Sequence, residues 1–298
     1  MKYRPPRRPA RTPSRPRLRD NEITMPTYRD QAIVLREYKL GEADRIVTLL
    51  TRSNGKVRAV ARGVRRTSSR IGGRLEPFNH VDVQFARGRS LDVVAQVEAL
   101  HAYGAPLSAS YQRFTAGEVM VETADRLVAE EGSPAPRQFR LLLGALHALS
   151  EGTNDGVRPA PMILDSYLLR ALATAGYAPT LDGCARCGAP GRHAWFSPAA
   201  GGMVCEDCRS GATARPSPAA WALLGELLAG DWTATRDVDA AVQNEVDGLV
   251  AAFLNWHLEH ALRSLPLLDR SEESSELAGA PAPVEGSMAG MMPDAVRR

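Results

Sequence analysis

Two Cys-x-x-Cys pairs constrain the fold of this chain more than any other feature of its sequence. They are Cys184/Cys187 and Cys205/Cys208, with 17 residues between the pairs, and the 298 residues include no further cysteine. Each pair lets two thiolates converge on one ion, and the intervening residues form an arm that returns the second pair to the first. The spacing therefore predicts one structural Zn²⁺ bound by four thiolates, with no open position for water or substrate.

Two other roles for cysteine pairs fit the sequence less well. A redox site typically has a single pair beside a β-α-β pattern, and a disulfide framework requires an exported chain. The Arg-rich residues 1–20 lack the apolar core of a secretory signal, and no apolar run approaches the roughly 18 to 20 residues of a membrane-spanning helix. We therefore expect a cytoplasmic protein without membrane contact. His193 could replace one ligand, but with four thiolates available we expect it to be a loop residue.

The net charge of +3 conceals an uneven distribution of charge along the chain. Residues 1–20 carry eight basic residues and one acidic residue, and residues 25–100 carry 14 and 8. Residues 101–270 carry 13 basic and 19 acidic residues, and residues 271–298 carry 2 and 5. A basic front half joined to an acidic back half indicates an anion, most often nucleic acid, bound at one end and a different partner at the other.

Between Arg29 and Glu98 the apolar residues alternate with polar ones in five short runs. A period of two over four to eight residues predicts β-strands, and Gly-containing turns separate the runs. Five short strands in about 75 residues predict a small closed barrel of the oligonucleotide-binding (OB) kind, with a Tudor- or SH3-like barrel as the structural alternative. The runs are residues 31–36, 45–51, 56–62, 80–86 and 91–97.

From Tyr111 onward the apolar residues follow the period of a helix. One predicted packing stripe runs from Phe139 to Leu149, and another runs from Val242 to Trp256. Ser217 followed by proline predicts a helix start, and Gly230 predicts its end. The fold class is therefore a β barrel followed by an α-helical domain that the zinc module interrupts. The predicted divisions are a disordered basic arm (1–24), the barrel (25–105), the helical domain (106–180 and 215–268), the zinc module (181–214) and a disordered tail (269–298).

A run without acidic residues between Arg45 and Leu75 is the candidate DNA-binding region. In its third strand Val57, Ala59 and Ala61 would face the barrel interior, which leaves the basic side chains on the other face. Aromatic platforms are scarce here, so we expect electrostatics to dominate and sequence preference to be weak. The alternative is an ordinary solvated basic face. The candidate residues are Arg45, Lys56, Arg58, Arg62, Arg65, Arg66, Arg70 and Arg74.

The motifs of catalysis are missing from the sequence. Gly55-Lys56 is followed by valine and does not form a phosphate-binding loop, and there is no Gly-x-Ser-x-Gly elbow. His257 and His260 lie three apart on a predicted helix, but they do not form a His-Glu-x-x-His motif. A ligase-like enzyme would need a lysine in a Lys-x-Asp-Gly motif, which neither Lys39 nor Lys56 has. We therefore expect a protein that is not an enzyme.

Several segments together resemble the RecO family of bacterial recombination mediators. In the front half they are Tyr28-Arg29-Asp30 before AIVLR, LGEADRI at 40–46, GKVRAVARGVRR at 55–66 and LEPF at 75–78. In the back half, LLR at 168–170 and GYAP at 176–179 precede the first cysteine pair. The similarity covers about residues 27–265.

The resemblance to RecO implies an OB barrel, a helical domain and, in members that retain the cysteines, a four-cysteine zinc module. It implies binding of single- and double-stranded DNA, and annealing of complementary strands covered by single-strand-binding protein. It also implies a partnership with RecR that promotes RecA loading, location on the nucleoid when bound to DNA, and docking of the acidic tail of single-strand-binding protein on the helical domain. The alternative function is a zinc-ribbon or OB-type nucleic-acid regulator, or an RNA-binding protein, without annealing activity.

Overall fold

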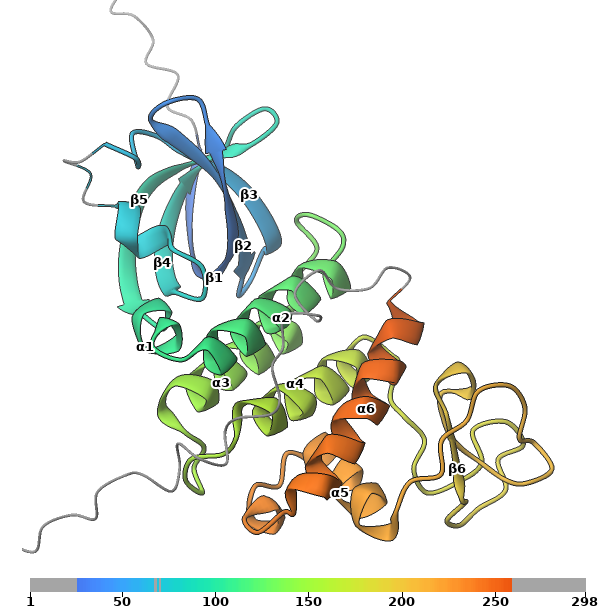
Figure 1. Ribbon diagram of the computed structural model, residues 1–298. Helices are drawn as coiled ribbons and strands as arrows, with labels where there is room; N and C mark the ends of the chain where they lie inside the picture. The colour runs from blue at the N-terminus through green and yellow to red at the C-terminus, as the bar shows by residue number, and fades with distance from the viewer. Residues whose placement is uncertain (1–25, 67–68, 70, 259–298) are drawn as a thin grey trace, which may run out of the picture.

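The computed structural model of the chain describes residues 26–66, 69 and 71–258. The predicted basic arm (1–24), the predicted tail (269–298), the end of the predicted helical domain (259–268) and Arg70 lie outside the described residues. Figure 1 shows a β barrel at one end, a group of helices in the middle and a small lobe at the other end.

The front of the chain forms a closed five-stranded barrel, which confirms the predicted fold. The strand order around the barrel is β1-β2-β3-β5-β4, and neighbouring strands are antiparallel except β3 and β5. The β3–β5 pairing joins only Ala59 to Asp92 and Val60 to Val93, so the first half of β3 leaves one edge open. The strands are β1 (Thr27–Leu40), β2 (Asp44–Thr51), β3 (Gly55–Ala61), β4 (His80–Ala86) and β5 (Asp92–His101).

Alternation of side chains fills the barrel interior. Val47, Leu49, Val57, Ala59 and Phe85 are buried together in one apolar cluster, because successive residues of a strand face opposite sides. The predicted inward face of β3 is therefore confirmed. A short 3₁₀ helix, η1 (Gly72–Leu75), precedes β4 and contributes Leu75 to the same cluster.

The outer face of the barrel is divided between packing and solvent. Ile33, Leu35 and Leu50 point outward and join the apolar core of the helices. Gly55 lies so close to the α2–α3 connection that an added Cβ would sit 1.8 Å from the carbonyl oxygen of Ser133. The barrel and the helices therefore share one apolar core through β1 and β2, and the start of β3 lies against the α2–α3 connection.

The helical part is built around α4, whose side chains are buried on nearly every face. Ser217 caps α5 by accepting a hydrogen bond from the amide of Ala220, and Gly230 ends the helix in a left-handed conformation, as predicted. The predicted stripe to Trp256 is wrong at its end, because Trp256 is 61% exposed while Phe253 is fully buried. The elements are α1 (Gly104–Ser108), α2 (Tyr111–Leu127), α3 (Pro136–Glu151), α4 (Ala160–Thr174), α5 (Pro218–Ala229), η3 (Thr233–Thr235) and α6 (Ala240–His257).

A small lobe lies between α4 and α5 in the sequence and packs on α6. It contains the hairpin β6 (Trp195–Ser197) and β7 (Gly202–Val204), joined through the 3₁₀ turn η2 (Pro198–Ala200). Phe196 of the hairpin contacts Phe253 of α6, with ring centroids 5.9 Å apart. Among the described residues no helix combines the length and the apolar composition that crossing a membrane requires.

Candidate nucleic-acid surface and metal centre

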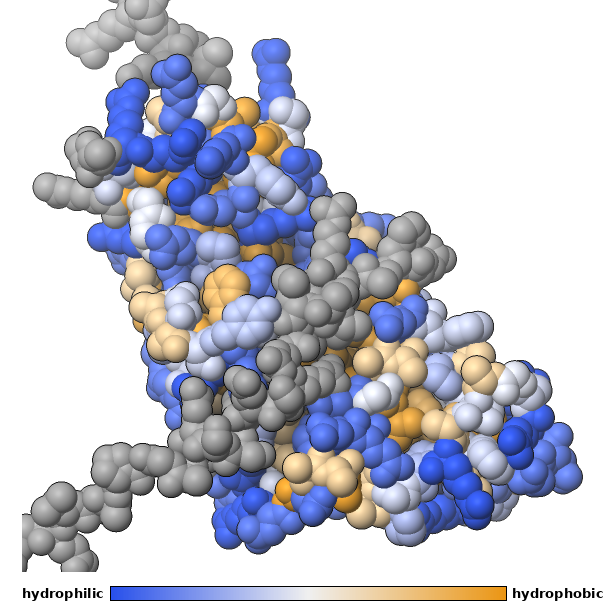
Figure 2. All heavy atoms as spheres, viewed as in Figure 1, coloured by the Kyte–Doolittle hydropathy of each residue, from blue (hydrophilic) through white to orange (hydrophobic). Residues whose placement is uncertain are grey.

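The outward side chains of β3 show where a polyanion could bind the barrel. Arg58 on this strand and Arg62 directly after it are exposed, with the partly exposed Val60 between them. Arg65 and Arg66 continue the basic surface in the turn after β3, where Arg65 also donates a hydrogen bond to the carbonyl oxygen of Gly41. In Figure 2 hydrophilic residues gather over the top of the barrel, with hydrophobic ones between them.

The position of Lys56 does not agree with the role of a free phosphate contact. Lys56 points outward, as predicted, but it is only 9% exposed because the end of α2 covers it. Its Nζ donates a hydrogen bond to the carbonyl oxygen of Asp125 at 2.8 Å and forms an ion pair with the Asp125 carboxylate at 3.2 Å. Lys56 therefore joins the barrel to the helices. The sequence alone could not predict this, because it does not show that α2 packs against β3.

The remaining candidates in the basic run lie away from the β3 face. Arg45 shares the inward side of β2 with Val47 and forms an ion pair with Glu37 near one end of the barrel. Arg74, on η1, donates a hydrogen bond to the carbonyl oxygen of Val97 at 2.8 Å. The basic run is thus spread over several surfaces of the barrel, and only part of it forms one face.

The four cysteines meet in the small lobe and fit a single metal ion. The Sγ atoms of Cys184, Cys187, Cys205 and Cys208 all lie within 4.8 Å of one another. His193 is held elsewhere, with its Nε2 2.9 Å from the carbonyl oxygen of Ala189, so it is a loop residue as expected.

The local backbone of the lobe explains how the sulfurs converge. In the first pair the amide of Gly188 donates to the carbonyl oxygen of Cys184, and Gly188 adopts a φ of 73° that favours glycine. In the second pair the amide of Cys208 donates to the carbonyl oxygen of Cys205. Each pair therefore forms a tight turn that directs both of its thiols to the same point.

The chemistry of the sulfurs also favours a bound cation. Backbone N–H groups of Cys187 and Cys205 lower the pKa of Cys184 to about 5, so this thiol is already poised as a thiolate ligand. Hydrogen bonds with the sulfurs of Cys205 and Cys187 raise the pKa of Cys208 to about 12. Four thiols this close share protons unless a cation replaces them, and four sulfur ligands suit Zn²⁺.

A groove in the helical part combines positive charge with an apolar floor. It has a volume of about 470 Å³ and lies between α3 and α4, with Trp232 from the α5–α6 connection on its rim. Arg137, Arg140 and Arg170 supply three positive charges, while the apolar lining includes Leu141 and Ile163. The sequence analysis gave no residue of this groove a binding role, although the arginines at positions 137 and 140 of one predicted helix were a visible signal.

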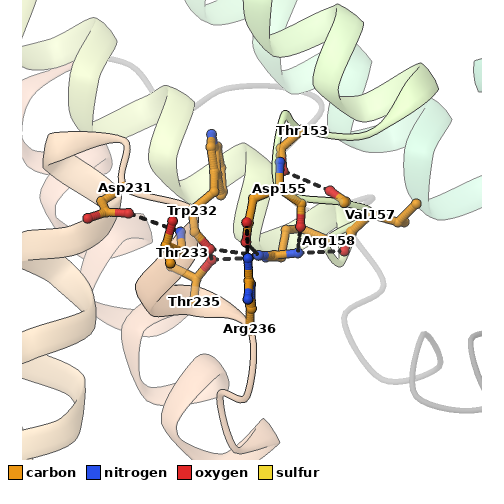
Figure 3. Close-up of polar contacts among 10 residues, drawn as sticks. Thr153, Asp155, Val157, Arg158, Asp231, Trp232, Thr233, Thr235 and Arg236 are labelled. Carbon is orange, nitrogen blue, oxygen red and sulfur yellow. Dashed lines mark hydrogen bonds and ion pairs between the residues drawn. The ribbon is translucent and has the colours of Figure 1, made fainter.

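An ion-pair network holds the Trp232 rim in place (Figure 3). Arg158 is buried, and it donates hydrogen bonds to the carbonyl oxygen of Trp232 at 2.6 Å and to the hydroxyl oxygen of Thr235 at 3.0 Å. Asp155 lies between Arg158 and Arg236 and pairs with both. Hydrogen bonds from Arg236 and then Arg158 lower the pKa of Asp155 to about 2. The network joins the α3–α4 connection to the α5–α6 connection.

The barrel topology and its basic face define an OB-type protein with an appended helical unit and a four-cysteine metal module. The model of the family described as "Recombination protein O N terminal" matches residues 25–103, and that of "Recombination protein O C terminal" matches residues 108–266. The chain therefore belongs to the RecO family.

Curated relatives agree with this assignment. The chain is 61% identical over 246 residues to the "DNA repair protein RecO" of Cutibacterium acnes. The aligned region covers 83% of this chain and all of the relative. It is 57% identical to the protein of the same name from a Nocardioides species, over 82% of this chain and 99% of the relative. It is 56% identical to the protein of the same name from Thermobifida fusca, over 83% of this chain and all of the relative.

Proposed function

We propose that this protein acts in DNA repair by homologous recombination. It binds single- and double-stranded DNA, anneals complementary strands coated with single-strand-binding protein and, together with RecR, promotes loading of RecA. The observation that carries the proposal is the exposed basic surface of Arg58, Arg62, Arg65 and Arg66 on an OB barrel. Membership of the RecO family and the names of the relatives support it.

The proposed activity requires no bond cleavage and no catalytic residue. Two complementary strands repel each other through their phosphates, and arginines that neutralise these phosphates let the strands approach. A guanidinium suits this role because it stays charged and donates several hydrogen bonds in one plane. Base pairing then supplies the sequence specificity, so the barrel itself can bind without reading sequence.

The groove of Arg137, Arg140 and Arg170 is the proposed docking site for the acidic tail of single-strand-binding protein. Carboxylates of the tail would pair with the three guanidinium groups, and an apolar side chain would fill the floor between α3 and α4. The helical region is acidic overall, but the groove is locally basic, which supports this position.

The metal has a structural role in this proposal. Cys184, Cys187, Cys205 and Cys208 would hold Zn²⁺ and close the small lobe, and the ion would stabilise the β6–β7 hairpin against α6. Four thiolate ligands would leave the ion no open position, so we assign no chemical step to the residues of the lobe.

An annealing assay on strands coated with single-strand-binding protein tests the DNA surface. We expect alanine at Arg58, Arg62, Arg65 and Arg66 together to reduce the annealing rate at least about tenfold, and to lower the salt dependence of single-strand binding by about 0.7 in log–log slope for each lost contact. The matched control changes the same number of exposed arginines in the small lobe, Arg186, Arg192, Arg209 and Arg215, and should anneal normally. Undiminished annealing by the barrel variant would overturn the placement of the site.

A second assay tests the groove. We expect Arg140→Glu and Arg170→Glu to abolish binding of a labelled peptide with the acidic tail sequence, because a carboxylate at either position repels the ligand. Both variants should bind naked DNA like the wild type, since the groove lies on α3 and α4 and not on the barrel. Unchanged peptide binding in both variants would place the docking site elsewhere.

A further inference from the structure

We infer that a row of three residues across the outer face of the barrel, Tyr38, Ile46 and Val60, contacts the bases of a single strand and gives this protein a preference for unpaired nucleic acid. The inference rests on the proposed DNA binding by the barrel. Basic residues alone do not distinguish single-stranded from double-stranded DNA, whereas an apolar strip that contacts bases does.

Strand register places the three residues side by side. Tyr38 of β1 lies opposite Ile46 of β2, and Ile46 lies opposite Val60 of β3. All three point away from the barrel interior, because their neighbours Val47, Ala59 and Ala61 are the ones buried in the barrel core. Tyr38 is 51% exposed, and Ile46 and Val60 are partly exposed.

Positive charges flank this row at both of its ends. Arg36, two residues from Tyr38, places its guanidinium 5.3 Å from the centre of the Tyr38 ring. At the other end, Arg58 on β3 and Arg62, directly after β3, lie two residues before and after Val60 and are both exposed. Arg36 also forms an ion pair with Asp125, and Arg58 forms one with Glu131. These two arginines therefore lie at the border between the part of the barrel face that packs on the helices and the part that is exposed.

An apolar strip with arginines at both of its ends suits a single strand better than a duplex. In a single strand the base faces are accessible, so a base can stack on an aromatic ring while its phosphates reach the flanking cations. In a duplex the bases are stacked on one another and only the phosphates and groove edges face a protein. The strip would therefore add binding energy for unpaired DNA, whereas the arginines serve both forms.

The other aromatic residues of the barrel are not available for stacking. Phe78, Phe85 and Tyr103 are buried. Tyr28 stacks on Phe85, and its hydroxyl donates a hydrogen bond to Asp92. Within the described part of the barrel, Tyr38 is thus the aromatic side chain that a base can reach.

Binding of three labelled ligands to the full chain separates bases from phosphates. The ligands are a single-stranded oligonucleotide, an abasic strand of equal length and a duplex, measured by fluorescence anisotropy at one salt concentration. We expect Tyr38→Ala to weaken binding of the intact strand about tenfold and to change binding of the abasic strand and the duplex less than about twofold. Tyr38→Phe should bind like the wild type, and so should Tyr177→Ala, a matched change at an exposed tyrosine of the helical part.

The outcomes distinguish this inference from the proposed function. If Tyr38→Ala weakens all three ligands equally or none of them, the strip does not contact bases and the inference is wrong. If the four-arginine barrel variant binds DNA like the wild type, the proposed DNA surface itself fails. As an independent measurement, photo-crosslinking to a bromouridine-containing strand should give an adduct on Tyr38 or its immediate neighbours, and adducts confined to the helical part would contradict the inference.

Discussion

Two cationic residues, one on β3 and one directly after it, show how the same charge can serve different roles. Lys56 and Arg62 both point outward, yet Asp125 and the end of α2 enclose Lys56, while Arg62 is exposed. A charge enclosed by its partner stabilises the fold, because removing one partner leaves the other buried and unpaired. A charge in solvent is free to meet a phosphate.

The first prediction compares these two residues directly. Lys56→Met should lower the free energy of unfolding by about 2 kcal/mol, since Asp125 keeps only its ion pair with Arg36. Arg62→Ala should change stability by less than about 0.5 kcal/mol and weaken DNA binding instead. Urea denaturation and DNA titration of both variants check this, and the opposite pattern would show that Lys56 is the phosphate contact.

The second prediction concerns the carboxylate of Asp155. Its pKa lies at about 2, below the ordinary value of about 3.9, so it contributes stability that is complete above pH 4 and is lost as the pH falls toward 2. The urea midpoint of the wild type should therefore exceed that of Asp155→Asn by a constant amount between pH 7 and 5. The difference should shrink below pH 4. A difference that does not depend on pH would mean that the ion pairs with Arg158 and Arg236 do not set this pKa.

At the scale of elements, the sequence pattern predicted what depends on neighbours in the chain. Alternation identified the five strands, Ser217 and Gly230 marked the ends of α5, and the cysteine spacing identified the cluster of sulfurs. These features arise from local backbone geometry and from ligand spacing.

Features that depend on packing between distant segments were not predictable from the same patterns. The burial of Lys56 requires knowing that α2 ends over β3, and the exposure of Trp256 requires knowing that α6 has no partner on that side among the described residues. The groove between α3 and α4 depends on Arg170 and Trp232, which are 62 residues apart in the sequence. Periodicity specifies which face of an element is apolar but not which element covers it.

The third prediction concerns the small lobe. We expect the wild type to contain one zinc ion per chain and Cys184→Ser to lose both the metal and the folded lobe, because metal binding supplies much of the folding free energy of such modules. Phe196 would then lose its position against Phe253, so the packing that stabilises α6 should also weaken. Metal analysis and thermal unfolding check this, with Ser210→Ala in the same lobe as the control. A stable, metal-free Cys184→Ser would contradict it.

At the scale of the whole molecule, the two proposed binding surfaces lie on different parts of the chain, one on the barrel and one on the helices. The basic face belongs to β3 and the turn after it, and the arginine groove belongs to α3 and α4. The shared core of Ile33, Leu35 and Leu50 with the helices fixes one unit against the other. On the proposed function, DNA and an acidic protein tail would bind at the same time without competing for the same cations.

The fourth prediction follows from this separation. A saturating amount of the acidic tail peptide should leave the affinity for a short oligonucleotide unchanged to within about twofold, because the sites share no residue. Annealing of coated strands should nevertheless require both surfaces in the same chain, so a mixture of the barrel variant and the Arg170→Glu variant should not restore the wild-type rate. Complementation by the mixture would show that the two surfaces can act from separate molecules.

The contact of the α2–α3 connection with the open edge of β3 also has a consequence for experiment. The amide of Gly132 donates to the carbonyl oxygen of Lys56 at 2.9 Å, in a place where β3 has no strand partner. Its hydrogen can exchange with solvent deuterium only when this bond breaks, so its exchange rate measures how often the barrel separates from the helices. A single backbone position can thus report, in the unmodified protein, whether bound DNA or a bound tail tightens the junction between the two units.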